Sequence, residues 1–200
     1  MVGMARQVFR VLFGFRVVNP PTLRPPYVLA PNHVSFLDPV VVQLAHPRHV
    51  TFLMTEAIYR VRPLRWFFRF WEAIPVPEDR APGEALKAAF RTIRSGGVVG
   101  IYPEGQISPN GTLQEGKQGV AMIMLRAGVP VVPVAIFGTY EVLPRQARFP
   151  RPGRIRVVFG DPIFPPETPK DRKGAARELS ARVMEAIAAL QARHGDPQRA

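Results

Sequence analysis

The chain of 200 residues contains no cysteine, and this absence excludes several kinds of chemistry at once. Without a thiol there is no disulfide framework, no thiolate nucleophile and no cysteine-ligated metal site. The absence is also consistent with a reducing compartment. Acidic residues are scarce too, 15 against 27 lysines and arginines, which gives a net charge of +12. This excess favours polyanionic partners such as anionic lipid headgroups, phosphorylated substrates or nucleic acid.

Long hydrophobic runs are missing as well. No apolar run is long enough to span a bilayer, and the amino-terminal stretch lacks a small-residue cleavage site, so neither a transmembrane helix nor a signal peptide is expected. Residues 1–18 are nonetheless apolar and aromatic, with arginines in between. We predict an amphipathic helix that lies in a membrane interface, with Arg10 and Phe13 as contacts. The alternative is a helix that packs on the domain or on a partner subunit.

A second basic and aromatic stretch covers residues 60–71. Tryptophan at headgroup level and arginine beside anionic lipid both favour a bilayer surface, so Trp66 and Phe67 are predicted as further membrane contacts. The alternatives are a core helix with solvated arginines and stacking on nucleic-acid bases. No recognised nucleic-acid motif accompanies the charge, so no nucleic acid is expected as a partner. We expect a peripheral or monotopic protein on anionic lipid at the cytoplasmic face of the cell membrane.

Short runs rich in valine and isoleucine alternate with helical patterns along the chain. Strands are predicted at residues 27–30, 49–54, 73–76, 98–102, 131–137 and 155–160, and helices at 39–45, 63–71, 83–94, 116–127 and 170–193. This alternation indicates an α/β fold: a single domain over 19–200 with a largely parallel or mixed central sheet flanked by helices, after the amino-terminal helix. Functional sites in such sheets lie beyond the carboxyl ends of the strands, where His33 and Glu104 fall.

Asn32 and His33 follow the first predicted strand, and Asp38 stands five positions after the histidine. Histidine takes a proton near neutral pH, and a carboxylate within reach fixes its tautomer and stabilises the imidazolium that forms. Such a pair is the minimum needed to deprotonate an alcohol that attacks a carbonyl. Asp38 followed by Pro39 is also typical of a helix N-cap with proline at the first helical position, and both roles are compatible.

A second candidate block follows the strand predicted at 98–102. Glu104 and Gly105 stand at the strand end, and Lys117 lies among glycines at the start of the helix predicted at 116–127, an arrangement that suits an anion. The alternative is an ordinary connecting loop, because Asn-Gly at 110–111 is a turn signal.

In this order, the blocks resemble the glycerolipid acyltransferase family, typified by the 1-acylglycerol-3-phosphate (lysophosphatidate) acyltransferases. The matching segments are N-H-x-x-x-x-D at 32–38, P-E-G at 103–105, the glycine-lysine segment at 116–121 and the proline-flanked strand at 127–135. The resemblance implies transfer of a fatty acyl group from acyl-CoA or acyl carrier protein to a hydroxyl of lysophosphatidate, in phospholipid biosynthesis. It implies a membrane-associated enzyme without a metal, another cofactor or a covalent acyl intermediate.

The resemblance also implies roles for individual residues. His33 is the general base and Asp38 its orienting partner, while Asn32, Glu104, Gly105 and Lys117 lie around the substrate. The residues themselves agree, because neither a cysteine nor a G-x-S-x-G elbow is present to carry the acyl group. The histidines outside this pattern show no metal-like spacing, so they are predicted to be structural or exposed; they are His46, His49 and His194.

Two positions depart from the family pattern. The family carries an arginine two residues after P-E-G, where this chain has Ile107, which cannot form a charge-assisted bond to phosphate. Arg80 comes later than the pattern expects; we predict it as a substrate ligand, with a surface arginine as the alternative. Lysophosphatidate remains the leading acceptor. The alternatives are a different or non-phosphorylated acceptor (a glycolipid, a lyso-aminolipid or a carotenoid sugar) and a basic membrane- or nucleic-acid-binding module without catalysis.

Overall fold

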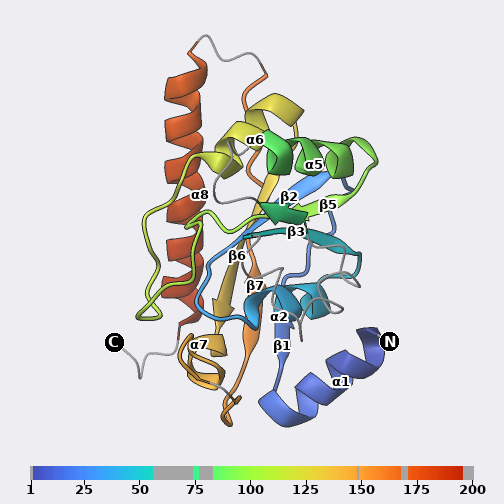
Figure 1. Ribbon diagram of the computed structural model, residues 1–200, viewed down its shortest axis with the longest axis vertical. Coiled ribbons are helices and arrows are strands. Elements are labelled where there is room, and N and C mark those ends of the chain that lie inside the picture. Colours follow the sequence, from blue (N-terminus) through green and yellow to red (C-terminus); the bar gives the residue numbers. More distant parts are fainter. Residues whose placement is uncertain (1, 56–73, 77–82, 148, 168–170, 196–200) are drawn as a thin grey trace.

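The structure is a computed structural model that describes residues 2–55, 74–76, 83–147, 149–167 and 171–195. Its centre is a seven-stranded sheet in the order β1-β7-β6-β2-β5-β3-β4 (Figure 1). Neighbouring strands are parallel except for β6 and β7, so the predicted largely parallel or mixed sheet is confirmed. The strands are β1 (Arg16–Val18), β2 (Tyr27–Pro31), β3 (Val50–Thr55), β4 (Ile74–Val76), β5 (Val98–Gly100), β6 (Val131–Phe137) and β7 (Arg156–Phe159).

Helices cover both faces of the sheet. On one face lie α1 (Val2–Phe13) and α2 (Asp38–Ala45), whose apolar side chains join one core cluster. On the other face lie α5 (Gly83–Arg94), α6 (Gly119–Ala127) and α8 (Arg172–His194), which join a second cluster. Figure 1 shows α8 running along one side of the sheet and α1 well away from it. A short helix, α7 (Thr139–Val142), follows β6 directly.

Strand β2 shows why these sequences form central strands. Tyr27 and Leu29 point into the cluster under α1 and α2, whereas Val28 and Ala30 point into the cluster under the other helices. All five residues of β2 are buried. A parallel strand covered on both faces needs apolar side chains at consecutive positions, which is the pattern of this run.

The amino-terminal helix is shorter than predicted. Helix α1 ends at Phe13, Gly14 adopts a left-handed conformation with φ +51°, and Arg16–Val18 then pair with β7 as an edge strand that the sequence analysis did not predict. The signal for this strand was the pair Val17 and Val18 between a glycine and Asn19, which also has a positive φ. Residues 16–18 therefore belong to the sheet, and residues 14 and 15 connect it to α1, instead of forming the end of the predicted interface helix.

Other elements follow the predictions with small shifts at their ends. Helix α6 begins at Gly119 rather than at residue 116, so Lys117 lies in the loop before the helix. In α8, apolar residues at three- and four-residue spacing are buried as predicted, from Ala176 to Leu190. The helix predicted at 63–71, and with it Trp66, Phe67 and Arg80, lies outside the described residues. Within the described ranges, no helix combines the length and the hydropathy that crossing a bilayer requires.

Candidate active site

The candidate site forms where the carboxyl ends of three neighbouring strands meet. Strand β2 is the middle strand of the sheet, between β6 and β5, and runs parallel to both. The segments that leave these strands at that edge are the loop 32–37, the long loop 101–118 and α7. His33, Glu104 and Thr139 therefore come together from distant parts of the chain, as expected for a parallel sheet.

His33 and Asp38 form the central contact. The His33 Nδ1 lies 2.8 Å from the Asp38 Oδ2, and the side chain of Asp38 is fully buried while that of His33 is 13% exposed. Because a carboxylate accepts, Nδ1 carries the proton in this pair and Nε2 of the neutral ring keeps a free lone pair. The geometry thus provides an oriented base with a partner for its positive form.

Three further donors hold the Asp38 carboxylate in place. The backbone N–H groups of Val34 and Ser35 donate to its Oδ2 at 2.6 and 2.7 Å. The hydroxyl of Thr139, fully buried at the start of α7, donates to its Oδ1 at 2.6 Å. Both oxygens are therefore occupied, so the carboxylate has one position and one orientation toward His33.

The predicted N-cap role of Asp38 is wrong. Leu37 is the N-cap of α2, and its side chain makes no capping bond. Asp38 is the first helical residue, so proline takes the second helical position instead of the predicted first. The physical reason is the direction of the carboxylate. It turns back to the amides of the preceding loop, at Val34 and Ser35, instead of forward to the first turn of the helix.

Glu104 joins the two loops of the site. Its Oε1 accepts from the N–H of His33 at 2.6 Å and its Oε2 from the N–H of Gln114 at 2.8 Å. A second link runs between the same loops, because the N–H of Ser108 donates to the carbonyl of His33 at 2.8 Å. Burial raises the pKa of Glu104 above its usual value, and the two amide bonds offset this only in part. Both carboxylate oxygens bind backbone, so in this structure Glu104 positions His33, and its predicted contact with substrate stays a prediction.

Asn32 acts as a link between strands. Its Oδ1 accepts from the N–H of Ile136 at 2.7 Å, and its Nδ2 donates to the carbonyl of the same residue at 3.3 Å. The side chain is buried and continues the pairing of β2 with β6 beyond the end of β2. The amide that we predicted to bind substrate is thus engaged with the backbone of β6.

Gly105 and Lys117 lie against each other at the same edge. Gly105 has φ +70°, and a Cβ at this position would stand 2.8 Å from the Lys117 Nζ. The N–H of Lys117 also donates to the carbonyl of Pro103 at 2.7 Å. The structure therefore places the exposed ammonium of Lys117 over the loop that carries Glu104. Ile107, by contrast, is buried, so the position of the family arginine is part of the apolar interior.

Sequence reasoning missed two residues that contact the pair directly. The ring of Tyr102 stacks on the ring of His33, with 3.8 Å between centroids and 16° between planes. Thr139 binds Asp38 from a position 101 residues further along the chain. Tyr102 could have been suspected because it precedes the P-E-G block; nothing in the sequence marks Thr139.

The other histidines behave as predicted where the structure describes their bonds. His46 is buried, its Nε2 lies 2.7 Å from the Tyr27 hydroxyl, and its Nδ1 lies 2.9 Å from the Arg48 carbonyl. Burial lowers the pKa of His46, which favours its neutral ring. Among the described residues, no group of three or more histidines and carboxylates could hold a metal ion.

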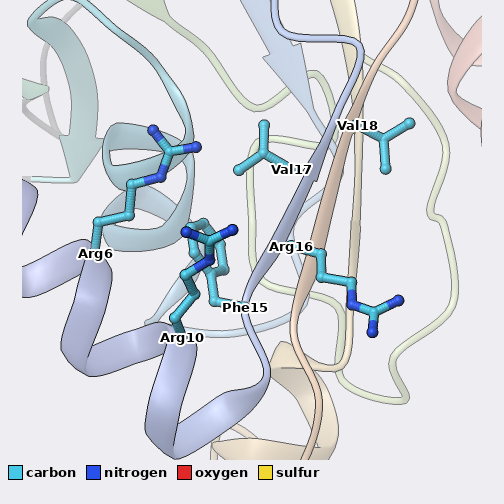
Figure 2. Close-up of a pocket in the computed structure, with 6 residues that line it drawn as sticks. All are labelled: Arg6, Arg10, Phe15, Arg16, Val17 and Val18. Atoms are coloured by element: carbon cyan, nitrogen blue, oxygen red, sulfur yellow. The ribbon is translucent and has the colours of Figure 1, made fainter.

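A separate surface lies between α1 and β1. A pocket of about 280 Å³ lies here. Figure 2 shows the residues that line it, which are Arg6, Arg10, Phe15, Arg16, Val17 and Val18. Arg10 is exposed, as its predicted membrane contact requires. Phe13, the other predicted contact, instead packs against the core beside Phe9, one turn away. The large apolar side chains that α1 exposes are Met4, Val8, Val11 and Leu12.

Comparison with known proteins points to one family. The model of the family described as Acyltransferase matches residues 14–137, more than half of the chain. The matched segment contains His33, Asp38, Glu104 and Lys117.

Curated relatives and one solved structure carry related names. A chloroplastic 1-acyl-sn-glycerol-3-phosphate acyltransferase from Brassica napus is 29% identical over 149 residues, which cover 73% of this chain and 43% of the relative. The enzyme of that name from Bacillus subtilis is 23% identical over 166 residues, which cover 80% of each chain. The chain spans 43% and 41% of the lengths of the Brassica and Arabidopsis relatives. The crystal structure of the 1-acyl-sn-glycerophosphate acyltransferase PlsC from Thermotoga maritima has the same fold, with a TM-score of 0.69 at 24% identity over 94% of this chain and 78% of that one.

Proposed function

The chain belongs to the Acyltransferase family, and from this premise we propose that it transfers a fatty acyl group from a thioester to the free hydroxyl of lysophosphatidate, giving phosphatidate. The observation that carries the proposal is the 2.8 Å contact between the His33 Nδ1 and the buried Asp38 carboxylate. The acceptor is inferred from the relatives, several of which are named 1-acyl-sn-glycerol-3-phosphate acyltransferases.

In the proposed reaction, the Nε2 of His33 takes the proton of the acceptor hydroxyl. The oxygen attacks the thioester carbonyl, the tetrahedral intermediate collapses, and the carbon–sulfur bond breaks as the ester forms. The imidazolium returns its proton to the leaving thiolate, so the base is regenerated and no acyl group is held by the protein. Asp38, held by its three other donors, stabilises the imidazolium between these steps.

The donor in this proposal is acyl-CoA or acyl carrier protein, a co-substrate rather than a cofactor, and the scheme uses no metal. Lys117 is the proposed ligand of the acceptor phosphate, since its ammonium lies over Gly105 while Ile107 is buried. The same burial of Ile107 favours a second candidate, an acyltransferase of this family whose acceptor has no phosphate at that place. Lysophosphatidate and a monoacylglycerol therefore form the informative pair of acceptors.

We also propose that α1 rests on an anionic bilayer at the cytoplasmic face of the membrane. The support is that α1 exposes large apolar side chains among its described residues, and that its arginines line a pocket against β1. Apolar insertion together with arginine at headgroup phosphates is the usual basis of interfacial binding.

The first experiment measures acyl transfer from a long-chain acyl-CoA to lysophosphatidate in vesicles. His33→Ala should lower kcat by about 10²- to 10⁴-fold, because it removes the base. His49→Ala is the matched control: this exposed histidine precedes β3, at the opposite edge of the sheet, and activity should be unchanged. Equal loss in both variants, or wild-type activity in folded His33→Ala, contradicts the mechanism.

The second experiment addresses the acceptor. Lys117→Ala should raise KM for lysophosphatidate but not for monoacylglycerol, while Lys173→Ala, an exposed change on α8, should alter neither. A wild type that acylates monoacylglycerol in preference to lysophosphatidate would replace the first candidate with the second.

A further inference from the structure

The ring of Tyr102 is one layer of a three-ring stack behind the proposed base. His33 lies on one side at a centroid distance of 3.8 Å and 16° between planes. Phe52, from β3, forms the next layer at 5.7 Å and 17°. Gly100, on β5, makes room for this arrangement, because a Cβ there would overlap the Phe52 ring.

The hydroxyl of Tyr102 is a second notable feature of this stack. It is buried and has no hydrogen-bond partner among the described residues. Burial, together with the nearby Asp38 carboxylate, raises the pKa of Tyr102 well above its usual value, so the side chain remains a neutral phenol. A buried hydroxyl without a hydrogen-bond partner lowers the free energy of unfolding, and no hydrogen bond from the described residues offsets this loss. The ring is therefore the part of Tyr102 that the site uses.

A flat aromatic face against an imidazole has two physical effects. It leaves the ring one plane in which to lie, so that with Nδ1 bound to Asp38 the direction of Nε2 is also determined. It also attracts a cation, because the face of an aromatic ring carries negative potential. The second effect strengthens only when His33 becomes an imidazolium, which happens during the proposed transfer.

We propose that Tyr102 is a positioning residue for acyl transfer: its ring, backed by Phe52, holds the imidazole of His33 with Nε2 toward the acceptor hydroxyl and stabilises the imidazolium that forms there. The inference rests on the proposed function, since it gives Tyr102 its effect through the base. The charged groups that face His33 in this arrangement are Asp38 and Glu104, and neither changes in the variants used to test it.

The test compares Tyr102→Phe with Tyr102→Leu. The phenylalanine variant keeps the ring and removes the unpartnered hydroxyl, so kcat should stay within about twofold of wild type and the thermal midpoint should not fall. The leucine variant removes the aromatic face, so kcat should fall on the order of tenfold while KM for both substrates stays within about twofold. Phe52→Leu, which removes only the backing ring, should give a smaller loss of kcat and serves if Tyr102→Leu does not fold.

A spectroscopic readout separates this inference from the proposed function. Proton NMR of the His33 ring should show upfield ring-current shifts in wild type and Tyr102→Phe that are lost in Tyr102→Leu. The kinetic comparison uses whichever acceptor the wild type acylates, or the hydrolysis of the thioester if it acylates none. An acceptor other than lysophosphatidate therefore overturns the proposed function but not the proposed role of Tyr102. Full kcat in Tyr102→Leu, an equal loss in both variants, or a loss confined to KM overturns the inference.

Discussion

The carboxyl edge of the sheet and the amino-terminal surface differ in the burial and the hydrogen bonding of their charged side chains. At the edge, Asp38 and Glu104 are buried and each of their four oxygens accepts at least one hydrogen bond. Between α1 and β1, the arginines at 6, 10 and 16 are exposed, and none forms an ion pair with a carboxylate in the described part of the chain. The carboxylates proposed to orient the base are bound on all sides by the protein, whereas the arginines proposed to contact lipid are left exposed.

Among changes at the carboxyl edge of the sheet, Asp38→Asn should cause the largest loss of activity and stability. The change leaves one neutral carbonyl oxygen for the amides of Val34 and Ser35 and the ring of His33, and it turns an N–H toward the Thr139 hydroxyl. It also removes the negative charge that stabilises the imidazolium in the proposed reaction. We expect kcat to fall by about 10²- to 10⁴-fold and the free energy of unfolding to fall by about 2–4 kcal/mol. Kinetic assays and urea unfolding measure both, with the exposed Asp161→Asn as control. Activity within threefold of wild type would show that the reaction does not depend on the contact between His33 and Asp38.

Glu104→Gln tests whether a buried carboxylate is needed to join two loops. The glutamine amide can satisfy only one of the two backbone N–H groups, so the free energy of unfolding should fall by about 1–3 kcal/mol. Because burial raises the pKa of Glu104 in the folded state, its contribution to stability is full below its ordinary pKa and is lost as the pH rises through the folded value.

The pH dependence of stability follows from the upward shift of the Glu104 pKa. The stability difference between wild type and Glu104→Gln, measured by urea unfolding from pH 4 to 8, should narrow as the pH rises, since only wild type titrates at this position. A difference that widens with pH would mean that the two amide bonds to the carboxylate outweigh its burial.

Thr139→Val tests a single hydrogen bond at the carboxyl edge of the sheet and should have a smaller effect on kcat. It removes the only donor to the Asp38 Oδ1 among the described residues and keeps the shape of the side chain. We expect kcat to fall about tenfold, as for the loss of one bond to a charged group, and Thr139→Ser to restore most of the rate. If the valine variant keeps wild-type activity while the serine variant loses it, the methyl contacts of Thr139 matter and its hydroxyl does not.

Arg10→Ser probes the second region and should have the smallest effect. Binding to vesicles that contain anionic lipid should weaken about fivefold, and the effect should disappear in high salt or on neutral vesicles. Arg177→Ser makes the same change of charge at an exposed position on α8, on the other face of the sheet, and should bind as wild type does. Equal weakening in both variants would assign the binding to net charge alone.

Contacts made within a short stretch of chain were open to prediction. His33 and Asp38 are five positions apart, and the loop between them closes on itself through the amides of Val34 and Ser35. Strand β6 and helix α5 have the predicted bounds, 131–137 and 83–94, because glycine and proline mark their ends. Pro130 and Gly138 flank the strand, while Gly83 begins the helix and Gly96 follows it. The edge strand β1 was not predicted, because three residues are too few to show an apolar periodicity distinct from that of the preceding helix.

Sequence alone therefore determined the α/β alternation, the pairing of His33 with Asp38, and the excess of positive charge. Tertiary structure alone decided that Thr139 completes the Asp38 site, that Glu104 reaches the His33 amide across 71 residues, and that Tyr102 lies flat on the imidazole. The reason is the strand order. Because β2 lies between β5 and β6 and runs parallel to both, loops far apart in sequence leave the sheet side by side. No local pattern of side chains records that order.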